Sequence, residues 1–348
     1  MSAKTDPGGT PTQDYDYVLP AAAIAQTPLA DRGASRMLVL QRRGHSRDSE
    51  VSRLPEFLRA EDCLVLNDTR VRAARLRGEV EGRAGEVLLL RDLGEGRYTA
   101  LVRPARALAP GSSLEGQGWR ALVEARWQDH PGGRRVALEV QPGLDLEAAG
   151  EVPLPPYIKH PLDQPQRYQT VYSSGPAVSA AAPTAGLHLT LELLRQLEAI
   201  GVRLVRVQLE VGLATFSPIR TRTIEAHPMH SERITISATA ADQLRAARSR
   251  GGRVVAVGTT AVRCLESRPD GRGGVVPGAE ETSLYLLPGS RFQVVDGLLT
   301  NFHQPRSSLL VLVSGFYGGA RVRRAYRDAL ARGYRFLSFG DCMFGWRA

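Results

Sequence analysis

The chain has 348 residues, a hydrophobic fraction of 43% and a formal net charge of +9, with a pI near 9.9. This length suits two domains, and the hydrophobic fraction excludes a disordered chain. The positive charge favours a polyanionic partner such as nucleic acid, because basic side chains neutralise phosphates. Since only Lys4 and Lys159 are lysines, the charge also fits an arginine-rich composition with no such partner.

The cysteine content and the termini indicate a cytoplasmic protein. Cys63, Cys264 and Cys342 lie far apart and form no CxxC pair, which argues against a disulfide framework and a thiolate metal site. Residues 1–13 are polar, lack the apolar core of a secretory signal and are predicted to be a disordered tail. The most apolar run, SLLVLVSGFYGG from Ser308, is too short to cross a bilayer.

Changes in composition divide the rest of the chain into two domains. From about Ala73 to Gly150, short alternating runs separated by Gly and Pro predict a small antiparallel β domain. After a proline-rich connector, strands alternate with helices, which indicates an α/β domain. The prediction is an α/β main domain, residues 14–72 and 151–348, carrying an inserted small antiparallel β-barrel domain, residues 73–150.

The first buried strand of the main domain is CLVL, residues 63–66, and polar residues follow it. Asn67, Thr69 and Arg70 are therefore expected to face a ligand at the end of this strand. For Arg70, a surface ion pair is the alternative.

The stretch AAAPTAGLHLT, residues 180–190, places a histidine at a turn of small residues. Gly186 frees the backbone there, and Thr190 is predicted to cap a helix that ends at Gly201. A histidine in this position could take part in catalysis or only pack against its neighbours.

Further elements follow in order. Residues 202–212 predict a strand with Val205 and Val207 on one face and Glu210 on the other. Thr239 is predicted to cap the next helix, and residues 253–258 are predicted to form a buried strand. Residues 334–341 are predicted to form a last strand, which ends at Asp341.

Gly258, Thr259 and Thr260 open a helix directly after the buried strand. Free backbone N–H groups and the positive end of the helix dipole would bind a carboxylate or a phosphate there. In the alternative, one of the threonines only caps the helix.

Three further groups of residues could take part in catalysis or ligand binding. Asn301 and His303 precede a proline and could bind a ligand or stabilise a turn. His227, His230 and Glu232 lie within six residues, but the proline after His227 disrupts the helical spacing that a metal site would need, so acid–base work or substrate contact is favoured. Two more charged residues have structural alternatives: Arg263 could hold an anion or form an ion pair, and Asp341 could anchor a hydroxyl or cap a loop.

The chain lacks GxGxxG, Walker A, HExxH and GxSxG motifs, which argues against several common enzyme classes. The strings it does contain, among them LNDTRVRAARLRG, PLPPYI, YQTVYS, AAPTAGLHLT, HPMHSE, VGTTAVRCLES, LLTNFHQPRSSLLVLVSGFYG and YRFLSFGD, occur in order from about Asp16 to Met343. Together they resemble the S-adenosylmethionine:tRNA ribosyltransferase-isomerase family of queuosine biosynthesis. APTAGLH and TNFH-x-P-x-S are the most distinctive of them.

The resemblance implies an α/β fold with an inserted β-barrel, and an enzyme that consumes S-adenosylmethionine as a ribosyl donor. The acceptor would be 7-aminomethyl-7-deazaguanine at the wobble position of tRNA, and the products epoxyqueuosine-tRNA, adenine and methionine. We therefore expect a cytoplasmic monomer that binds S-adenosylmethionine and tRNA, needs no metal or cofactor and does not bind a membrane.

The resemblance also suggests roles for individual residues. His188 would be the acid–base group at the reacting ribose, at a turn shaped by Thr184 and Gly186. Asn301 and His303 would lie on the sugar or deazaguanine side. The methionine carboxylate or a tRNA phosphate would be bound by Thr259, Thr260 and Arg263. A second proton-handling cluster would consist of His227, His230 and Glu232, and a hydroxyl would be bound by Asp341.

This chain departs from the family pattern at two positions of one motif, with Glu210 in place of a histidine and Ala214 in place of a glycine. Two other functions stay open: an S-adenosylmethionine-dependent RNA methyltransferase and a non-catalytic RNA-binding protein. The methyltransferase would release S-adenosylhomocysteine instead of adenine and methionine. The binding protein would need neither the APTAGLH nor the TNFH group.

Overall fold

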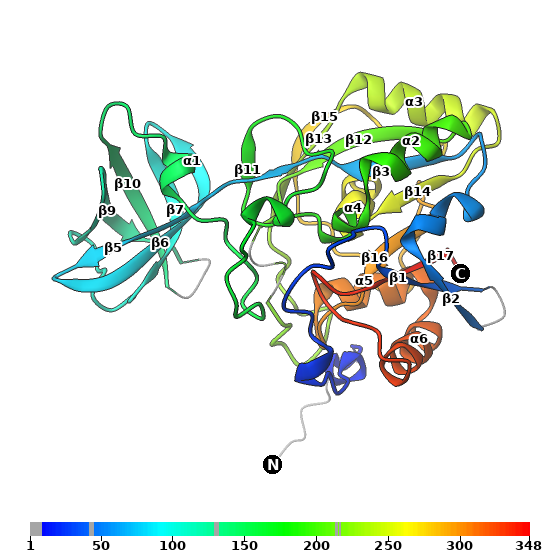
Figure 1. Ribbon diagram of the computed structural model, residues 1–348, viewed down its shortest axis with the longest axis horizontal. Coiled ribbons are helices and arrows are strands. Elements are labelled where there is room, and N and C mark those ends of the chain that lie inside the picture. Colours follow the sequence, from blue (N-terminus) through cyan, green and yellow to red (C-terminus); the bar gives the residue numbers. More distant parts are fainter. Residues whose placement is uncertain (1–8, 42–44, 129–131, 213–214, 216) are drawn as a thin grey trace, which may run out of the picture.

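The main domain is built on a mixed sheet of nine strands (Figure 1). The computed structural model describes residues 9–41, 45–128, 132–212, 215 and 217–348. In spatial order the strands are β15 (Gly278–Thr282), β13 (Glu232–Ile236), β12 (Arg203–Leu209), β3 (Cys63–Asn67), β14 (Val254–Val257), β16 (Gly297–Asn301), β17 (Cys342–Trp346), β1 (Arg36–Leu40) and β2 (Ser46–Glu50). Strands β12, β3, β14 and β16 run parallel, while β17 is antiparallel to β16 and parallel to β1.

Both faces of this sheet are covered by other elements. Alternate residues of its strands point to opposite faces and pack into two separate hydrophobic cores. In β1, Leu38 and Leu40 belong to one core, and Met37 and Val39 belong to the other. The α-helices are α2 (Leu191–Ala199), α3 (Ala238–Ser249), α4 (Thr259–Ser267), α5 (Ser308–Tyr317) and α6 (Gly319–Ala331). The 3-10 helices are η1 (Thr12–Tyr15), η2 (Ala21–Ala23), η3 (Val51–Phe57), η4 (Pro165–Tyr168) and η5 (Thr184–His188).

The predicted insertion is a closed antiparallel barrel that stands to one side of the main domain (Figure 1). Its strands are β5 (Arg75–Val80), β6 (Arg83–Gly94), β7 (Arg97–Arg103), β8 (Ser113–Gly116), β9 (Trp119–Arg126) and β10 (Gly133–Val140), followed by the short helix α1 (Leu146–Ala149). The two connections to the main domain lie side by side, since the backbones of Arg75 and Glu151 exchange two hydrogen bonds. Nearby, β4 (Arg70–Val71) and β11 (Ala177–Ser179) form a two-stranded parallel sheet. The α/β fold with an inserted barrel is thus confirmed.

The structure confirms one predicted helix start and corrects another. Thr190 caps α2, with its hydroxyl accepting the Leu193 N–H at 3.0 Å. The cap predicted at Thr239 is wrong, because Ser237 accepts the Ala240 N–H and the helix begins at Ala238.

The strand predicted over 334–341 is also wrong. Leu337 has a φ of 70°, which an extended strand does not contain, and the strand β17 begins only after Asp341. The apolar run from Ser308 is helix α5, capped by Ser307.

The folded part of the chain begins earlier than expected. Residues 1–8 of the predicted tail lie outside the described residues. From Gly9 onward the chain is held in place, since the Thr10 N–H donates to the Glu225 carboxylate and the Thr12 hydroxyl to the Thr221 carbonyl. In the part of the chain that the structure describes, no helix is long and apolar enough to cross a membrane.

Candidate active site

A small cavity of about 30 Å³ lies where β16 ends beside η5. It is lined by Tyr157, Thr184, Thr215, Asn301, Phe302, His303, Gln304, Ser307, Leu309, Leu337 and Ser338. Three of these, Thr184, Asn301 and His303, were predicted as site residues from two distant segments of the sequence. The fold brings them together because η5 packs against β16.

The η5 turn needs a glycine at its centre. A Cβ atom at Gly186 would collide with the Tyr172 hydroxyl and lie 2.9 Å from Cγ2 of Thr170. Without a side chain, the turn can approach these two residues closely. Thr184 on one side of Gly186 is thereby held at the cavity, and His188 on the other side is buried behind it.

Asn301 is the centre of a buried hydrogen-bond network. Its side-chain nitrogen donates to the Leu337 carbonyl at 3.1 Å, which fixes the orientation of the amide because a carbonyl can only accept. The amide oxygen then accepts from the Thr184 hydroxyl at 3.1 Å. The lone pairs of that hydroxyl remain available to a ligand in the cavity.

His188 completes this network from behind. Its Nε2 lies 3.0 Å from the Asn301 nitrogen and therefore accepts, so the ring proton is on Nδ1, 3.0 Å from the Ser35 hydroxyl. The side chain is 3% exposed, and burial together with the positive charges of Arg32 and Arg335 lowers the pKa of His188 to about 4. Both ring nitrogens are thus occupied, and His188 orients Asn301.

His303 lies at the cavity itself. Its backbone is fixed on both sides, because its N–H donates to the Tyr326 hydroxyl at 2.9 Å and its carbonyl accepts from the Tyr17 hydroxyl at 2.5 Å. Nε2 of the ring lies 2.9 Å from the Thr300 hydroxyl. Burial lowers the pKa of His303 to about 3, so the imidazole is neutral at neutral pH.

The predicted cluster of His227, His230 and Glu232 is only partly assembled. The Glu232 carboxylate is 4% exposed and accepts from the Arg263 guanidinium, the Gly212 N–H and the Thr215 hydroxyl. His230 lies 3.4 Å from the same carboxylate, and burial lowers its pKa to about 4. His227 instead packs edge-on against the ring of Tyr285.

Glu232 reaches the cavity indirectly, through Thr215. Thr215 lines the cavity and donates its hydroxyl hydrogen to Glu232 at 3.1 Å, so its lone pairs also remain free. Arg263 is 3% exposed, and its other guanidinium nitrogens donate hydrogen bonds to the carbonyls of Leu284 and Thr282. The structure matches the ion-pair alternative for Arg263, which holds Glu232.

The start of α4 lies against η5. Gly258 adopts a φ of 87°, and a Cβ atom placed there would lie 3.5 Å from the Ala185 side chain. Neither Thr259 nor Thr260 caps the helix with its hydroxyl. The Thr260 hydroxyl is buried and, among the described residues, has no hydrogen-bond partner.

Two of the residues predicted to bind substrate at the end of β3 are instead structural. Asn67 is fully buried and exchanges two hydrogen bonds of 3.0 Å with the backbone of Leu209. The Thr69 hydroxyl is buried 2.6 Å from that of Ser179. Arg70 is exposed and pairs with Glu147 at 3.2 Å. Asn67 and Thr69 thus join neighbouring segments and do not face outward, whereas Arg70 matches the surface ion-pair alternative.

Asp341 likewise has a structural role. Its two carboxylate oxygens accept the backbone N–H groups of Arg36 and Arg335, at 2.9 and 2.8 Å. This matches the loop-capping alternative and not the hydroxyl anchor. Glu210 is half-buried beside Arg233, and burial raises the pKa of its carboxyl.

Other residues of the site were not predicted from the sequence. Tyr157 lines the cavity and its hydroxyl lies 2.6 Å from that of Ser338. Thr215 and Ser35 are further examples, and neither stands out in a motif of titratable residues. Among the described residues, no group of three or more His, Cys, Asp or Glu is placed to hold a metal ion.

The buried histidines make stability depend on pH. His188, His230 and His303 have folded-state pKa values of about 4, about 4 and about 3, against 6.5 in the unfolded chain, so below pH 6.5 the unfolded state binds more protons. We expect the free energy of unfolding to fall between pH 7 and pH 5, approaching about 1.4 kcal/mol per pH unit for each histidine. The raised pKa of Asp341 acts in the opposite direction.

Urea unfolding at pH 7, 6 and 5 checks this expectation. A free energy of unfolding that stays constant or rises over this interval would contradict it. The variant His188→Gln serves as the control, because it should remove one of these contributions and flatten the dependence.

The chain is similar to known proteins over almost its whole length. A family model described as "Queuosine biosynthesis protein" matches residues 12–344. An S-adenosylmethionine:tRNA ribosyltransferase-isomerase from Symbiobacterium thermophilum is 47% identical, covering 95% of this chain and 98% of that protein. One from Anaeromyxobacter dehalogenans is 48% identical, covering 95% and 97%. A crystal structure of the S-adenosylmethionine tRNA ribosyltransferase from Thermotoga maritima is similar with a TM-score of 0.55 and 33% identity, covering 95% of this chain and 99% of that one.

Proposed function

The chain belongs to the queuosine biosynthesis family as an S-adenosylmethionine:tRNA ribosyltransferase-isomerase, and we propose that it carries out this reaction at the cavity around Asn301. The enzyme transfers the ribosyl moiety of S-adenosylmethionine to 7-aminomethyl-7-deazaguanine in tRNA and isomerises it. The single observation that supports this location is the network that joins Thr184, Asn301 and His188 beside His303.

The polar wall of the cavity suits a group that donates hydrogen bonds. Thr184 donates to Asn301 and Thr215 donates to Glu232, so both hydroxyl oxygens offer lone pairs to the cavity. Ribose hydroxyls and the aminomethyl nitrogen are such donors. We assign these two threonines to the reacting ribose and the attacking amine.

His303 is the proton acceptor in this proposal. It is the one histidine among the described residues that line the cavity, and its Nδ1 can accept a proton when Nε2–H donates to the Thr300 hydroxyl. The reaction needs such a group, because the attacking amine loses a proton when it forms its new bond to carbon. His188, which has both nitrogens occupied, is a positioning residue that holds Asn301.

We place the methionine carboxylate of the donor at the start of α4. The backbone N–H groups of Thr259 and Thr260 lie in the first turn of α4 and therefore have no acceptor within the helix. The buried Thr260 hydroxyl can add a further donor. The sulfonium donor would then lie along η5, toward the cavity. S-Adenosylmethionine is a consumed substrate in this proposal, and the enzyme works as a monomer in the cytoplasm without a further cofactor.

Product analysis tests the function. The protein is incubated with S-adenosylmethionine and tRNA that carries 7-aminomethyl-7-deazaguanine, and the small products and the nucleosides are measured by mass spectrometry. We expect adenine and methionine in equal amounts, with epoxyqueuosine in the tRNA. Release of S-adenosylhomocysteine would indicate a methyltransferase instead, and tRNA binding without products would indicate a binding protein.

A further inference from the structure

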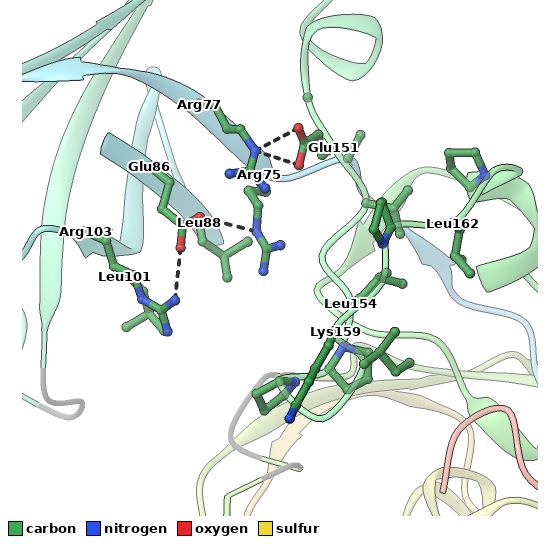
Figure 2. A pocket seen from close by; sticks show the side chains of 18 of the residues that line it. Arg75, Arg77, Glu86, Leu88, Leu101, Arg103, Glu151, Leu154, Lys159 and Leu162 are labelled. Atoms are coloured by element: carbon green, nitrogen blue, oxygen red, sulfur yellow. Dashed lines mark hydrogen bonds and ion pairs between the residues drawn. The ribbon is translucent and has the colours of Figure 1, made fainter. Parts of the chain in front are cut away.

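A groove of about 1010 Å³ separates the barrel from the main domain (Figure 2). One wall is formed by β5, β6 and β7, and the other by the proline-rich segment 150–165. This volume is at the upper end of the range for small-molecule pockets, and the groove is open to solvent. It is therefore suited to a larger ligand that lies along it.

The groove ends beside the catalytic cavity. Tyr157 and Thr215 line the cavity, while Ile158, Lys159 and Ser217 line the groove, so both hollows share the same two segments. A ligand that lies in the groove can consequently extend one group into the cavity.

The turn that carries Tyr157 and Lys159 is firmly held. The side chain of Gln26 donates to the Tyr157 carbonyl at 3.0 Å and accepts the Lys159 N–H at 2.9 Å. The Tyr157 hydroxyl is fixed by Ser338. The turn therefore sets the position of the lysine backbone relative to the cavity.

The charges of the groove leave a positive surplus. Glu86 lies between two arginines, 3.8 Å from Arg75 and 3.6 Å from Arg103, so it compensates only one of them (Figure 2). Arg77 is compensated by Glu151 at 2.8 Å. The exposed Lys159 ammonium has no ion-pair partner among the described residues, so it is available to an anion.

We propose that this groove receives the single-stranded anticodon segment of the tRNA, and that Lys159 binds a backbone phosphate next to the reacting nucleotide. The inference rests on the proposed function. A base reaches a buried cavity only when it leaves the stack, and contacts to its flanking phosphates position it there. Four leucines in the groove, Leu88, Leu101, Leu154 and Leu162, offer apolar surface to unstacked bases.

A second basic surface on α6 is the alternative. Arg323 and Arg327 are exposed there, but Asp14 and Asp16 line the same hollow. These two carboxylates offset the charge of the two arginines, whereas the groove keeps a positive surplus, so the groove is favoured.

The variant Lys159→Gln tests the proposal. We expect the Kd and the KM for the modified tRNA to rise about tenfold, since a hydrogen bond to a charged group is lost. The dependence of log Kd on log salt should lose about one unit of slope. Lys159→Arg should keep most of the affinity. The KM for S-adenosylmethionine should stay within about twofold, because the change affects tRNA positioning.

The control is Arg327→Gln, whose side chain is 77% exposed on α6. It should leave tRNA affinity unchanged. The groove proposal is overturned if Lys159→Gln binds tRNA like the wild type, if the loss occurs in Arg327→Gln instead, or if Lys159→Gln mainly raises the KM for S-adenosylmethionine. The tRNA affinity is measured without S-adenosylmethionine and therefore tests the groove alone. The proposed function is tested separately, by adenine release from the wild-type enzyme.

Discussion

Replacing His303 with glutamine is expected to lower kcat by about 10²–10⁴-fold, the usual contribution of a general acid–base group. The protein should still fold, because the bonds from Tyr17 and to Tyr326 involve the backbone of this residue. The measurement is the rate of adenine release at saturating S-adenosylmethionine and tRNA, with circular dichroism to confirm folding.

The matched comparison is made at His188, which acts through Asn301. His188→Gln keeps a hydrogen-bond acceptor for the Asn301 amide and should retain more activity than His188→Leu, which removes it. Neither change should shift the limbs of the pH–rate profile, since His188 is neutral above its pKa of about 4. If His303→Gln turned over at the wild-type rate and the His188 variants moved the profile, His188 would be the acid–base group.

Replacing Arg263 with methionine is expected to lower the free energy of unfolding by about 3–5 kcal/mol, the cost of leaving a buried charge without its partner. Glu232 is only 4% exposed and has Arg263 as its ion-pair partner. The burial that makes the pair vulnerable also lowers the pKa of Arg263, to about 10. Urea unfolding at pH 7.5 measures the loss.

Two further variants separate this cause from a general effect of lost arginines. The double variant Glu232→Gln/Arg263→Met should recover part of the stability, because the amide oxygen still accepts from Gly212 and Thr215 without a charge. Arg245→Met breaks the exposed pair with Asp242 and should cost about 1 kcal/mol or less. Equal losses in Arg263→Met and Arg245→Met would contradict the assignment.

The sequence was informative where periodicity and capping act locally. The β12 strand was predicted from its alternation, and Val205 and Val207 are buried as expected. The cap at Thr190 was also predicted. The segment 334–341 was missed because Leu337 enters the left-handed region, where its carbonyl meets the Asn301 amide. That contact depends on a residue more than thirty positions away.

The site was predicted only in part, for a similar reason. Motifs pointed to Thr184, His188, Asn301 and His303, and His188 was predicted to be the acid–base group, whereas His303 is the histidine that lines the cavity. This distinction depends on Ser35, whose hydroxyl occupies the second ring nitrogen of His188 from a distant segment. Polar residues at strand ends, such as Asn67, fit ligand binding and backbone bridging equally well until their partners are known.

The position of β17 in the sheet has a consequence for how the protein is made. Strand β17 lies between β16 and β1, and the loop residue before it, Asp341, bonds to Arg36 across 305 positions of the chain. At 5–20 residues per second on the ribosome, β1 waits roughly 15–60 s after its own synthesis for this neighbour. During that interval the β1–β2 hairpin presents an unpaired edge. The nascent chain stays soluble only if aggregation is slower than synthesis or a chaperone covers this edge until β17 pairs with β1.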